Sequence, residues 1–479
     1  MTGPDWLHFD AVAMRDGIAR HEIDGPALVD AALTRAKDMQ NVLNHFVSIR
    51  EDAARLEAQA AQAALKRGAT LGPLHGVPVV LKDMTPTQGD VWTEGSRLFD
   101  GRAATHDALI AARLKVAGAI VIGKTTTPEF AWSGRTDSPL WGVTRNPWNA
   151  DYSAGGSSGG TAVAVATGCA PLGEGSDMGG SIRIPASACN LIGLKPSWGR
   201  VPFDGAANRF DPLAHWGPLA RSCRDAALFL DVVQGRNNAD IAGAPPPVAF
   251  LEGLAAPVAG CRVALSVDLG CYAVEPAIAE NLRATAERLR ARGVIVDDVS
   301  LKFPAEATAT WDREWAVWLA FNYGDAAAGR EEMLSPDVRR LIEIGRRVSA
   351  LELRAGEWVR TRMAHALQPV LERYDALLCP TLARDVPPAE GAYASPPPDA
   401  EGRLRETTMT GMFNLLPRLP VLSVPSGFAP SGLPTGMQIV GRPGADLRVL
   451  QIGQLLGPCE MPEFPSGART FEDGAQPPC

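Results

Sequence analysis

Two dense clusters of glycine and serine, at residues 155–160 and 173–183, are the clearest sign of chemistry in the chain. Glycine loses more conformational freedom on folding than other residues, so such clusters persist where the backbone needs unusual dihedrals or a close approach. The glycines before Ser181 leave backbone N–H groups free to converge on one point, as an oxyanion requires. Either cluster alone could be a flexible turn. Because an apolar helix predicted at residues 162–167 joins the two, a linker is a poor interpretation.

Lys82 is the second candidate. Lysine is scarce, with seven residues against 39 arginines, and Lys82 follows the apolar run 79–81 and precedes Asp83. One interpretation is a lysine at a strand end that reaches water or pairs with Asp83. The other is a buried amine, which desolvation keeps uncharged and able to act as a base.

Three known motifs fit poorly. Residues 155–159 and 156–160 match G-x-S-x-G, but a nucleophile elbow needs a preceding strand and a later acid and histidine. The preceding stretch, 146–154, is loop-like, and only His215 and His365 follow. Neither cluster has the Gly-Lys-Ser/Thr of a P-loop, and no lysine has a serine three residues before it, as S-x-x-K requires.

The composition is that of an ordinary globular chain: 479 residues, 46% hydrophobic, with a formal charge of −8. This acidic balance argues against a nucleic-acid partner, since phosphate binding needs clustered Lys and Arg. No basic-then-apolar leader opens the chain and no uncharged apolar run reaches about 18 residues, so we expect a cytoplasmic protein with no membrane partner. The eight cysteines lack CxxC pairs and the seven histidines lack HExxH or HxxxH spacing, which predicts reduced thiols and no metal site.

Apolar periodicity predicts helices that alternate with short strands. Residues 10–67 carry apolar positions at three- and four-residue steps, which is typical of helices. Strands are predicted at 77–81, 119–122, 262–267 and 294–299, and helices at 108–117, 162–167 and 276–292. This alternation indicates an α/β layered fold. The Pro-rich stretch 385–401 is predicted to be a surface loop.

Several stretches together resemble the amidase signature family. They are residues 76–83, 155–160, 175–186, 193–200, 374–381, 413–414, 419–427 and 436–443. The similarity runs from about residue 25 to about residue 455 and is weakest from about 225 to 370. It implies one α/β/α domain over residues 1–479, a twisted mixed sheet of about eleven strands flanked by helices. It also implies an N-terminal helical segment (1–67) that packs on this domain and a variable region (225–400) that shapes the substrate pocket.

The resemblance implies a Ser–cis-Ser–Lys triad, with Ser181 as nucleophile, Ser157 as the bridging serine and Lys82 as base. The family spacing of 24 residues between the two serines selects Ser157 over Ser158. The oxyanion would be held by the backbone N–H groups of Met178, Gly179, Gly180 and Ser181. We expect Ser158 and Asp177 to form hydrogen bonds within the serine loops, and Arg183 to form a structural ion pair rather than bind substrate. No metal and no organic cofactor enters this mechanism.

The substrate pocket is less defined by the resemblance. Ala131 and Trp132 align with a family stretch that lines the acyl pocket, although core packing is an equal alternative. Trp311, Trp315 and Trp318 share one helical face, for which we favour core packing over the pocket. Phe210, His215 and Trp216 follow the signature in a predicted loop and could line the mouth of the pocket.

These features predict an amidase for a small apolar or aromatic amide, acting as a monomer or homodimer. Carbamate (urethane) and aryl-acylamide hydrolysis are alternatives within the family. A glutaminase subunit of a tRNA-dependent amidotransferase is a second alternative, although the stretch 200–221 lacks the pattern expected there. A non-catalytic subunit is a third alternative, and the intact Lys82, Ser157 and Ser181 argue against it.

Overall fold

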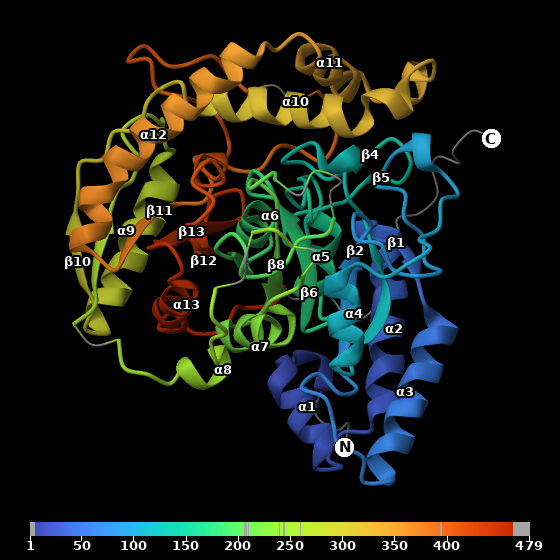
Figure 1. The fold of residues 1–479 in the computed structure, drawn as a ribbon. Helices are drawn as coiled ribbons and strands as arrows, with labels where there is room; N and C mark the ends of the chain where they lie inside the picture. Colours follow the sequence, from blue (N-terminus) through green and yellow to red (C-terminus); the bar gives the residue numbers. More distant parts are fainter. Residues whose placement is uncertain are drawn as a thin grey trace.

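A mixed sheet of eleven strands runs through the centre of the molecule (Figure 1). The computed structural model describes residues 5–205, 208, 210–238, 240–242, 245–258, 260–392 and 395–462. The strands lie in the order β1-β3-β2-β6-β8-β7-β12-β13-β11-β9-β10. Their bounds are β1 Phe46–Ile49, β2 Pro78–Lys82, β3 Ile120–Thr125, β6 Leu172–Asp177, β7 Ile192–Lys195, β8 His215–Ala220, β9 Arg262–Leu265, β10 Ile295–Asp298, β11 Ala376–Pro380, β12 Val421–Phe428 and β13 Pro434–Gly441. A separate pair, β4 (Asp137–Ser138) and β5 (Gly142–Val143), forms a small hairpin.

Thirteen α-helices lie within the described residues and cover the sheet. They are α1 Ala11–Ala19, α2 Gly25–Leu43, α3 Glu51–Lys66, α4 Leu109–Val116, α5 Gly159–Ala166, α6 Arg183–Ala188, α7 Cys223–Val233, α8 Phe250–Gly253, α9 Pro276–Ala291, α10 Ala307–Ala327, α11 Pro336–Gly345, α12 Ala350–Arg373 and α13 Asp446–Gln454. Figure 1 shows α10 and α11 along the top of the molecule, α12 running down its upper left side, and α1, α2 and α3 at its lower right. The prediction of an α/β fold with about eleven mixed strands and flanking helices is confirmed.

The strand β2 places the candidate base. Its residues, Pro-Val-Val-Leu-Lys, are buried along their whole length, as expected of a central strand covered on both faces. β2 pairs in parallel with β3 on one side and with β6 on the other. Because parallel strands end at the same edge of a sheet, Lys82 at the end of β2 and Asp177 at the end of β6 meet there. The two serine loops lead into α5 and α6 beside that edge.

The predicted helical stretch 10–67 contains a strand that the periodicity does not reveal. Residues Phe46–Ile49 form β1, which pairs antiparallel with β3. Helix α2 ends just before it, with Asn44 in the left-handed conformation as its C-cap. The other predicted strands and helices lie where expected, with ends that differ by up to three residues. Residues 385–392 and 395–401 contain no helix or strand, as predicted, but the prediction of a surface position was wrong for Val386 and Ala389, which are buried.

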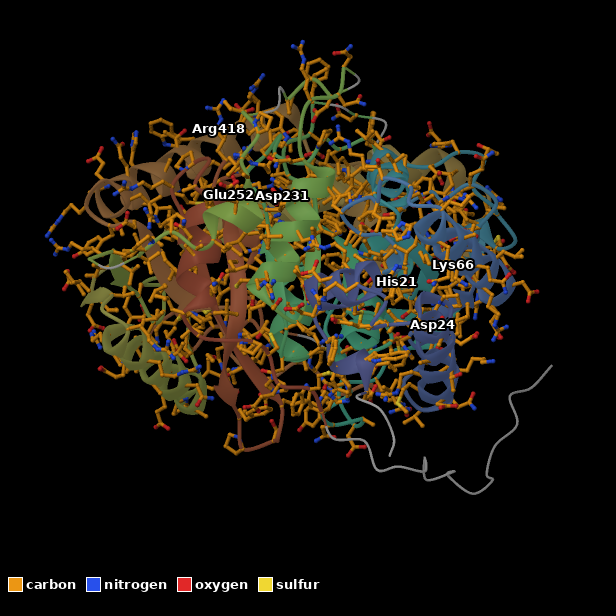
Figure 2. The ribbon with its side chains drawn as sticks, turned by 90° about the horizontal axis from the view of Figure 1, so that it is seen from below. His21, Asp24, Lys66, Asp231, Glu252 and Arg418 are labelled. Carbon is orange, nitrogen blue, oxygen red and sulfur yellow. The ribbon has the colours of Figure 1, made fainter. Side chains whose placement is uncertain are left out.

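The periphery is charged. Figure 2, which views the molecule from below, shows His21 and Asp24 in the turn between α1 and α2, Lys66 at the end of α3, and Arg418 at a distant edge. Asp231 of α7 anchors the short helix α8, because its carboxylate accepts the N–H groups of Phe250 and Leu251 at 2.7 and 2.9 Å.

The cysteines in the described part of the chain form no disulfide. Seven of them carry free thiols, and the eighth, Cys479, lies outside the described residues. None of the helices described is long and apolar enough to cross a membrane.

Candidate active site

Lys82 is fully buried, and its amine contacts two serine hydroxyls. Nζ lies 2.6 Å from Ser157 Oγ and 3.0 Å from Ser176 Oγ, both within hydrogen-bonding distance. Burial lowers the pKa of Lys82 from 10.5 to about 7, while the nearby carboxylates of Glu174 and Asp177 oppose this shift. The buried interpretation of Lys82 is therefore the one that the structure supports, because burial favours the uncharged amine.

The first serine loop holds Ser157 in an enclosed backbone passage. The peptide bond between Gly156 and Ser157 is cis, and both serines of the loop, Ser157 and Ser158, are fully buried. A methyl group at Gly156 would lie only 2.5 Å from the carbonyl oxygen of Ser133, so only glycine fits there. The neighbouring glycine, Gly155, has a φ of +76° and supplies the turn.

The second serine loop lies against the first. The N–H of Ser158 donates to the carbonyl oxygen of Ser181 at 3.1 Å. Ser181 itself is half-buried. Within the described residues, the Ser181 hydroxyl makes no hydrogen bond, not even to Ser157. A relay from Ser157 to Ser181 therefore requires a hydrogen bond between the two hydroxyls that is not among those of the described residues.

Residues 178–181, here called the oxyanion loop, carry the four N–H groups that were expected to bind an oxyanion. Only one of the four donates a hydrogen bond within the described residues. The N–H of Gly180 already donates to Asp177 Oδ1 at 2.8 Å, so the expected role of Gly180 as an oxyanion donor is corrected. The N–H groups of Met178, Gly179 and Ser181 have no acceptor among the described residues. These three remain open for an oxyanion.

A buried ion pair between Arg183 and Asp177 holds this loop in place. Arg183 binds Asp177 through two hydrogen bonds of 2.9 Å, and both side chains are fully buried. Burial alone raises the pKa of Asp177, but the charge of Arg183 and the hydrogen bonds from Arg183 and Asn414 outweigh it and hold that pKa well below its usual range. Asp177 also accepts the N–H of Ile182 at 3.3 Å. The expected structural ion pair of Arg183 is present.

Three residues of the site were missed in the sequence. Ser176 shares the amine of Lys82 with Ser157, and Asn414 donates to Asp177 Oδ1 at 3.0 Å. Glu174 is fully buried, and its Oε2 accepts the backbone N–H of Lys82 at 3.0 Å. Burial raises the pKa of Glu174. The two-residue step between Glu174 and Ser176 could have placed both on one face of a strand next to Lys82.

The segment with Ala131 and Trp132 lies beside the first serine loop. The next residue, Ser133, packs its carbonyl against Gly156. Phe130, Ala131 and Ser133 have φ of 53°, 60° and 129°, which costs roughly 1–3 kcal/mol each and is retained mainly at functional sites. Ala131 is 9% exposed, whereas the ring of Trp132 lines a cavity of about 500 Å³. Apolar and charged side chains share the rest of that cavity: Ala309, Asp312, Arg313, Ala316, Arg340, Leu341, Ile344, Arg347, Val348 and Glu352.

Trp311 and Trp315 of α10 have different surroundings. Trp315 is 4% exposed, stacks on Trp311 and Trp318 with ring centroids 5.7 and 5.1 Å apart, and packs in the core as predicted. Trp311 instead lines a small cavity of about 40 Å³ together with Gly179. Core packing alone therefore does not describe Trp311.

The expected mouth residues lie elsewhere. His215 and Trp216 belong to strand β8 and are buried, so the prediction of a loop was wrong for them. Phe210 is exposed and lines a groove of about 780 Å³ between α12 and residues 415–419. None of the predicted catalytic, oxyanion or substrate-contact residues lines that groove. Across the described part of the chain, no three His, Cys, Asp or Glu side chains converge as metal ligands would.

Comparison with known proteins gives consistent matches. The sequence profile of the family Amidase matches residues 27–450. A subunit of the glutamyl-tRNA(Gln) amidotransferase of Roseiflexus sp. (strain RS-1) is 34% identical over 467 positions, which cover 92% of this chain and 94% of the relative. An acylamidase of Rhodococcus erythropolis is 33% identical over 464 positions, covering 93% and 94%. The crystal structure of a bacterial aryl acylamidase of the amidase signature enzymes family superposes with a TM-score of 0.87 at 30% identity, covering 93% of this chain and 95% of that one.

Proposed function

The chain belongs to the amidase signature family, and from that membership we propose that it hydrolyses the C–N bond of a small amide through an acyl-enzyme on Ser181. The observation that carries this proposal is the 2.6 Å contact between Nζ of fully buried Lys82 and Ser157 Oγ. A lysine with a pKa of about 7 is half uncharged at pH 7 and can accept a proton there.

In the proposed first step, the neutral amine of Lys82 accepts the proton of Ser157, and Ser157 accepts the proton of Ser181. The Ser181 oxygen attacks the amide carbon and forms a tetrahedral intermediate. Its oxyanion is held by the open N–H groups of Met178, Gly179 and Ser181. Removing one such donor typically costs about 10²–10³-fold in kcat.

In the second step the C–N bond breaks. The proton returns from Lys82 through Ser157 to the leaving nitrogen, which departs as an amine. Water then attacks the acyl-enzyme, with the same groups moving its proton, and the carboxylic acid is released. Asp177, Arg183 and Ser158 hold the two serine loops in place and take no proton.

The cavity beside Trp132 supports a substrate class, although no residue of the proposed triad or of residues 178–181 lines it. Its volume of about 500 Å³ suits a small organic molecule, since ligand pockets commonly span roughly 300–1,000 Å³. The ring of Trp132 offers a flat apolar wall, which favours an aromatic or apolar acyl or amine portion. We therefore propose an arylamide or acylamide as substrate, with Ala131 and Trp132 in contact with it. An aryl carbamate is the close alternative, because the same oxyanion donors and leaving-nitrogen proton serve both.

A substrate panel tests this proposal. The panel holds 4-nitroacetanilide, 2-phenylacetamide, ethyl N-phenylcarbamate and 4-nitrophenyl acetate, assayed with wild type, Ser181→Ala and Lys82→Ala. We expect turnover of at least one amide that falls by roughly 10⁴-fold or more with Ser181→Ala. Amide turnover that survives Ser181→Ala would refute the mechanism. A carbamate hydrolysed faster than every amide would select the alternative substrate.

A second candidate function is glutamine hydrolysis within an amidotransferase. It is favoured by relatives 32–35% identical that are named as one subunit of glutamyl-tRNA(Gln) amidotransferases. Two measurements distinguish this function from that of an amidase active on its own as a monomer or homodimer. They are ammonia release from glutamine and co-purification with other subunits from the native source. Rapid turnover of 4-nitroacetanilide with none of glutamine would exclude the second candidate.

A further inference from the structure

Trp311 of helix α10 lies directly on the oxyanion loop. Its indole N–H donates to the carbonyl oxygen of Met178 at 3.0 Å. A methyl group at Gly179 would lie 2.1 Å from Cζ2 of the indole, and one at Gly411 would lie 3.2 Å from Cδ2. The indole thus fits between two glycine backbones, and any larger residue at Gly179 would displace it.

The hydrogen bond from Trp311 to the Met178 carbonyl also fixes the direction of the neighbouring Gly179 N–H. In a trans peptide unit the C=O and the N–H point in opposite directions. Because Trp311 holds the carbonyl of Met178, the N–H of Gly179 in the same peptide unit points away from the indole. That N–H is one of the three open donors of the oxyanion loop.

The following peptide unit is held in the same way. The hydroxyl of Thr410 donates to the carbonyl oxygen of Gly179 at 2.6 Å, and Asp177 accepts the N–H of Gly180 at 2.8 Å. Both peptide units around Gly179 are therefore fixed by side chains from other parts of the chain. A backbone with this much glycine would otherwise have wide conformational freedom.

We propose that Trp311 is a positioning residue of the oxyanion hole, which aims the Gly179 N–H at the substrate oxyanion through its bond to the Met178 carbonyl. This inference rests on the proposed function, because it assumes that an oxyanion forms at Ser181. It assigns a role to one tryptophan of the variable region.

Helix α10 supplies its own matched controls. The indole N–H groups of Trp315 and Trp318 are buried and have no acceptor within the described residues. Neither ring lines the cavities next to Trp132 or Gly179. Replacing each tryptophan by phenylalanine removes one indole N–H in every case, but only Trp311→Phe removes a hydrogen bond.

The test compares Trp311→Phe, Trp315→Phe and Trp318→Phe on the amide of the panel that wild type hydrolyses fastest. A displacement of about 1 Å at a reacting centre can cost 10²-fold. We expect Trp311→Phe to lower kcat by roughly 10–100-fold with KM within about threefold of wild type. The two control variants should keep kcat within about threefold. Binding of phenylboronic acid, which forms a tetrahedral adduct on a serine nucleophile, should weaken with Trp311→Phe by the same factor as kcat/KM.

Thr410→Val is the second variant, used in case Trp311→Phe does not fold. It removes the hydroxyl that holds the Gly179 carbonyl and should also lower kcat and weaken phenylboronic acid binding. A Trp311→Phe enzyme with wild-type kcat, or equal losses in all three tryptophan variants, would overturn this inference alone. A wild-type enzyme that is not labelled at Ser181 by a fluorophosphonate would overturn the proposed function, and this inference with it.

Discussion

Replacing Lys82 by methionine should abolish activity and stabilise the fold at neutral pH. Lys82 is fully buried, and burial lowers its pKa from 10.5 to about 7. Between these two values the unfolded chain binds a proton that the folded chain does not, so wild-type stability rises with pH across this window. The penalty of burying Lys82 is therefore fully present below pH 7 and fades toward pH 10.5.

The magnitude follows from the two pKa values. Proton linkage gives a penalty of about 4 kcal/mol at pH 7 and about 2 kcal/mol at pH 9. Methionine removes this penalty but also loses the hydrogen bonds to Ser157 and Ser176, at about 1 kcal/mol each, independent of pH. The stability gained by Lys82→Met should thus be about 2 kcal/mol larger at pH 7 than at pH 9.

Urea unfolding of wild type and Lys82→Met at pH 7 and pH 9 measures this difference. Lys66→Met is the matched control, because Lys66 lies exposed at the end of α3 (Figure 2). We expect no comparable pH-dependent gain from that variant. An equal effect of Lys82→Met at both pH values would refute the account of a buried, uncharged base.

Three further predictions concern the same site. For wild type, log(kcat/KM) should rise with pH up to about 7 and then level off, since the neutral form of Lys82 is the active base; a flat profile from pH 5 to 9 contradicts this. Ser157→Ala should lower kcat by roughly 10²–10⁴-fold. Ser158→Ala should lower kcat by less than about tenfold, because the hydrogen bond from residue 158 to the Ser181 carbonyl uses a backbone N–H that alanine keeps. A larger loss of kcat in Ser158→Ala than in Ser157→Ala would rule out Ser157 as the bridging serine. Arg183→Met leaves the carboxylate of Asp177 buried and unpaired and should lower the free energy of unfolding by about 3–5 kcal/mol, and an unchanged urea midpoint would count against a structural ion pair.

Local sequence patterns predicted the strand that carries Lys82 and the close backbone packing of the serine loops. The apolar run before Lys82 predicted a strand, and this strand positions the amine. The two Gly/Ser clusters predicted close backbone approach, and Gly156 packs against a neighbouring carbonyl in that way. The short strand β1 was missed because four residues between two long helices do not interrupt the helical period enough to reveal a strand.

Contacts between distant segments could not be read from periodicity. The helical face shared by Trp311 and Trp315 gives no sign that one ring reaches Met178, more than 100 residues earlier in the chain. The side chain of Asn414 likewise joins the site only through the tertiary fold. Even within the resemblance, Gly180 was expected to be an open donor. The carboxylate of Asp177 accepts its N–H, which only the three-dimensional geometry reveals.

The most direct test of the central claim is to map where a fluorophosphonate reacts. The reagent forms a phosphorus–oxygen bond with an activated serine and releases fluoride, and mass spectrometry of the digested protein locates the adduct. We predict a single adduct on Ser181 in wild type and none in Ser181→Ala, with labelling strongly slowed in Lys82→Ala. An adduct on Ser157 or Ser158, or labelling of Ser181 at an unchanged rate without Lys82, would contradict the proposed relay.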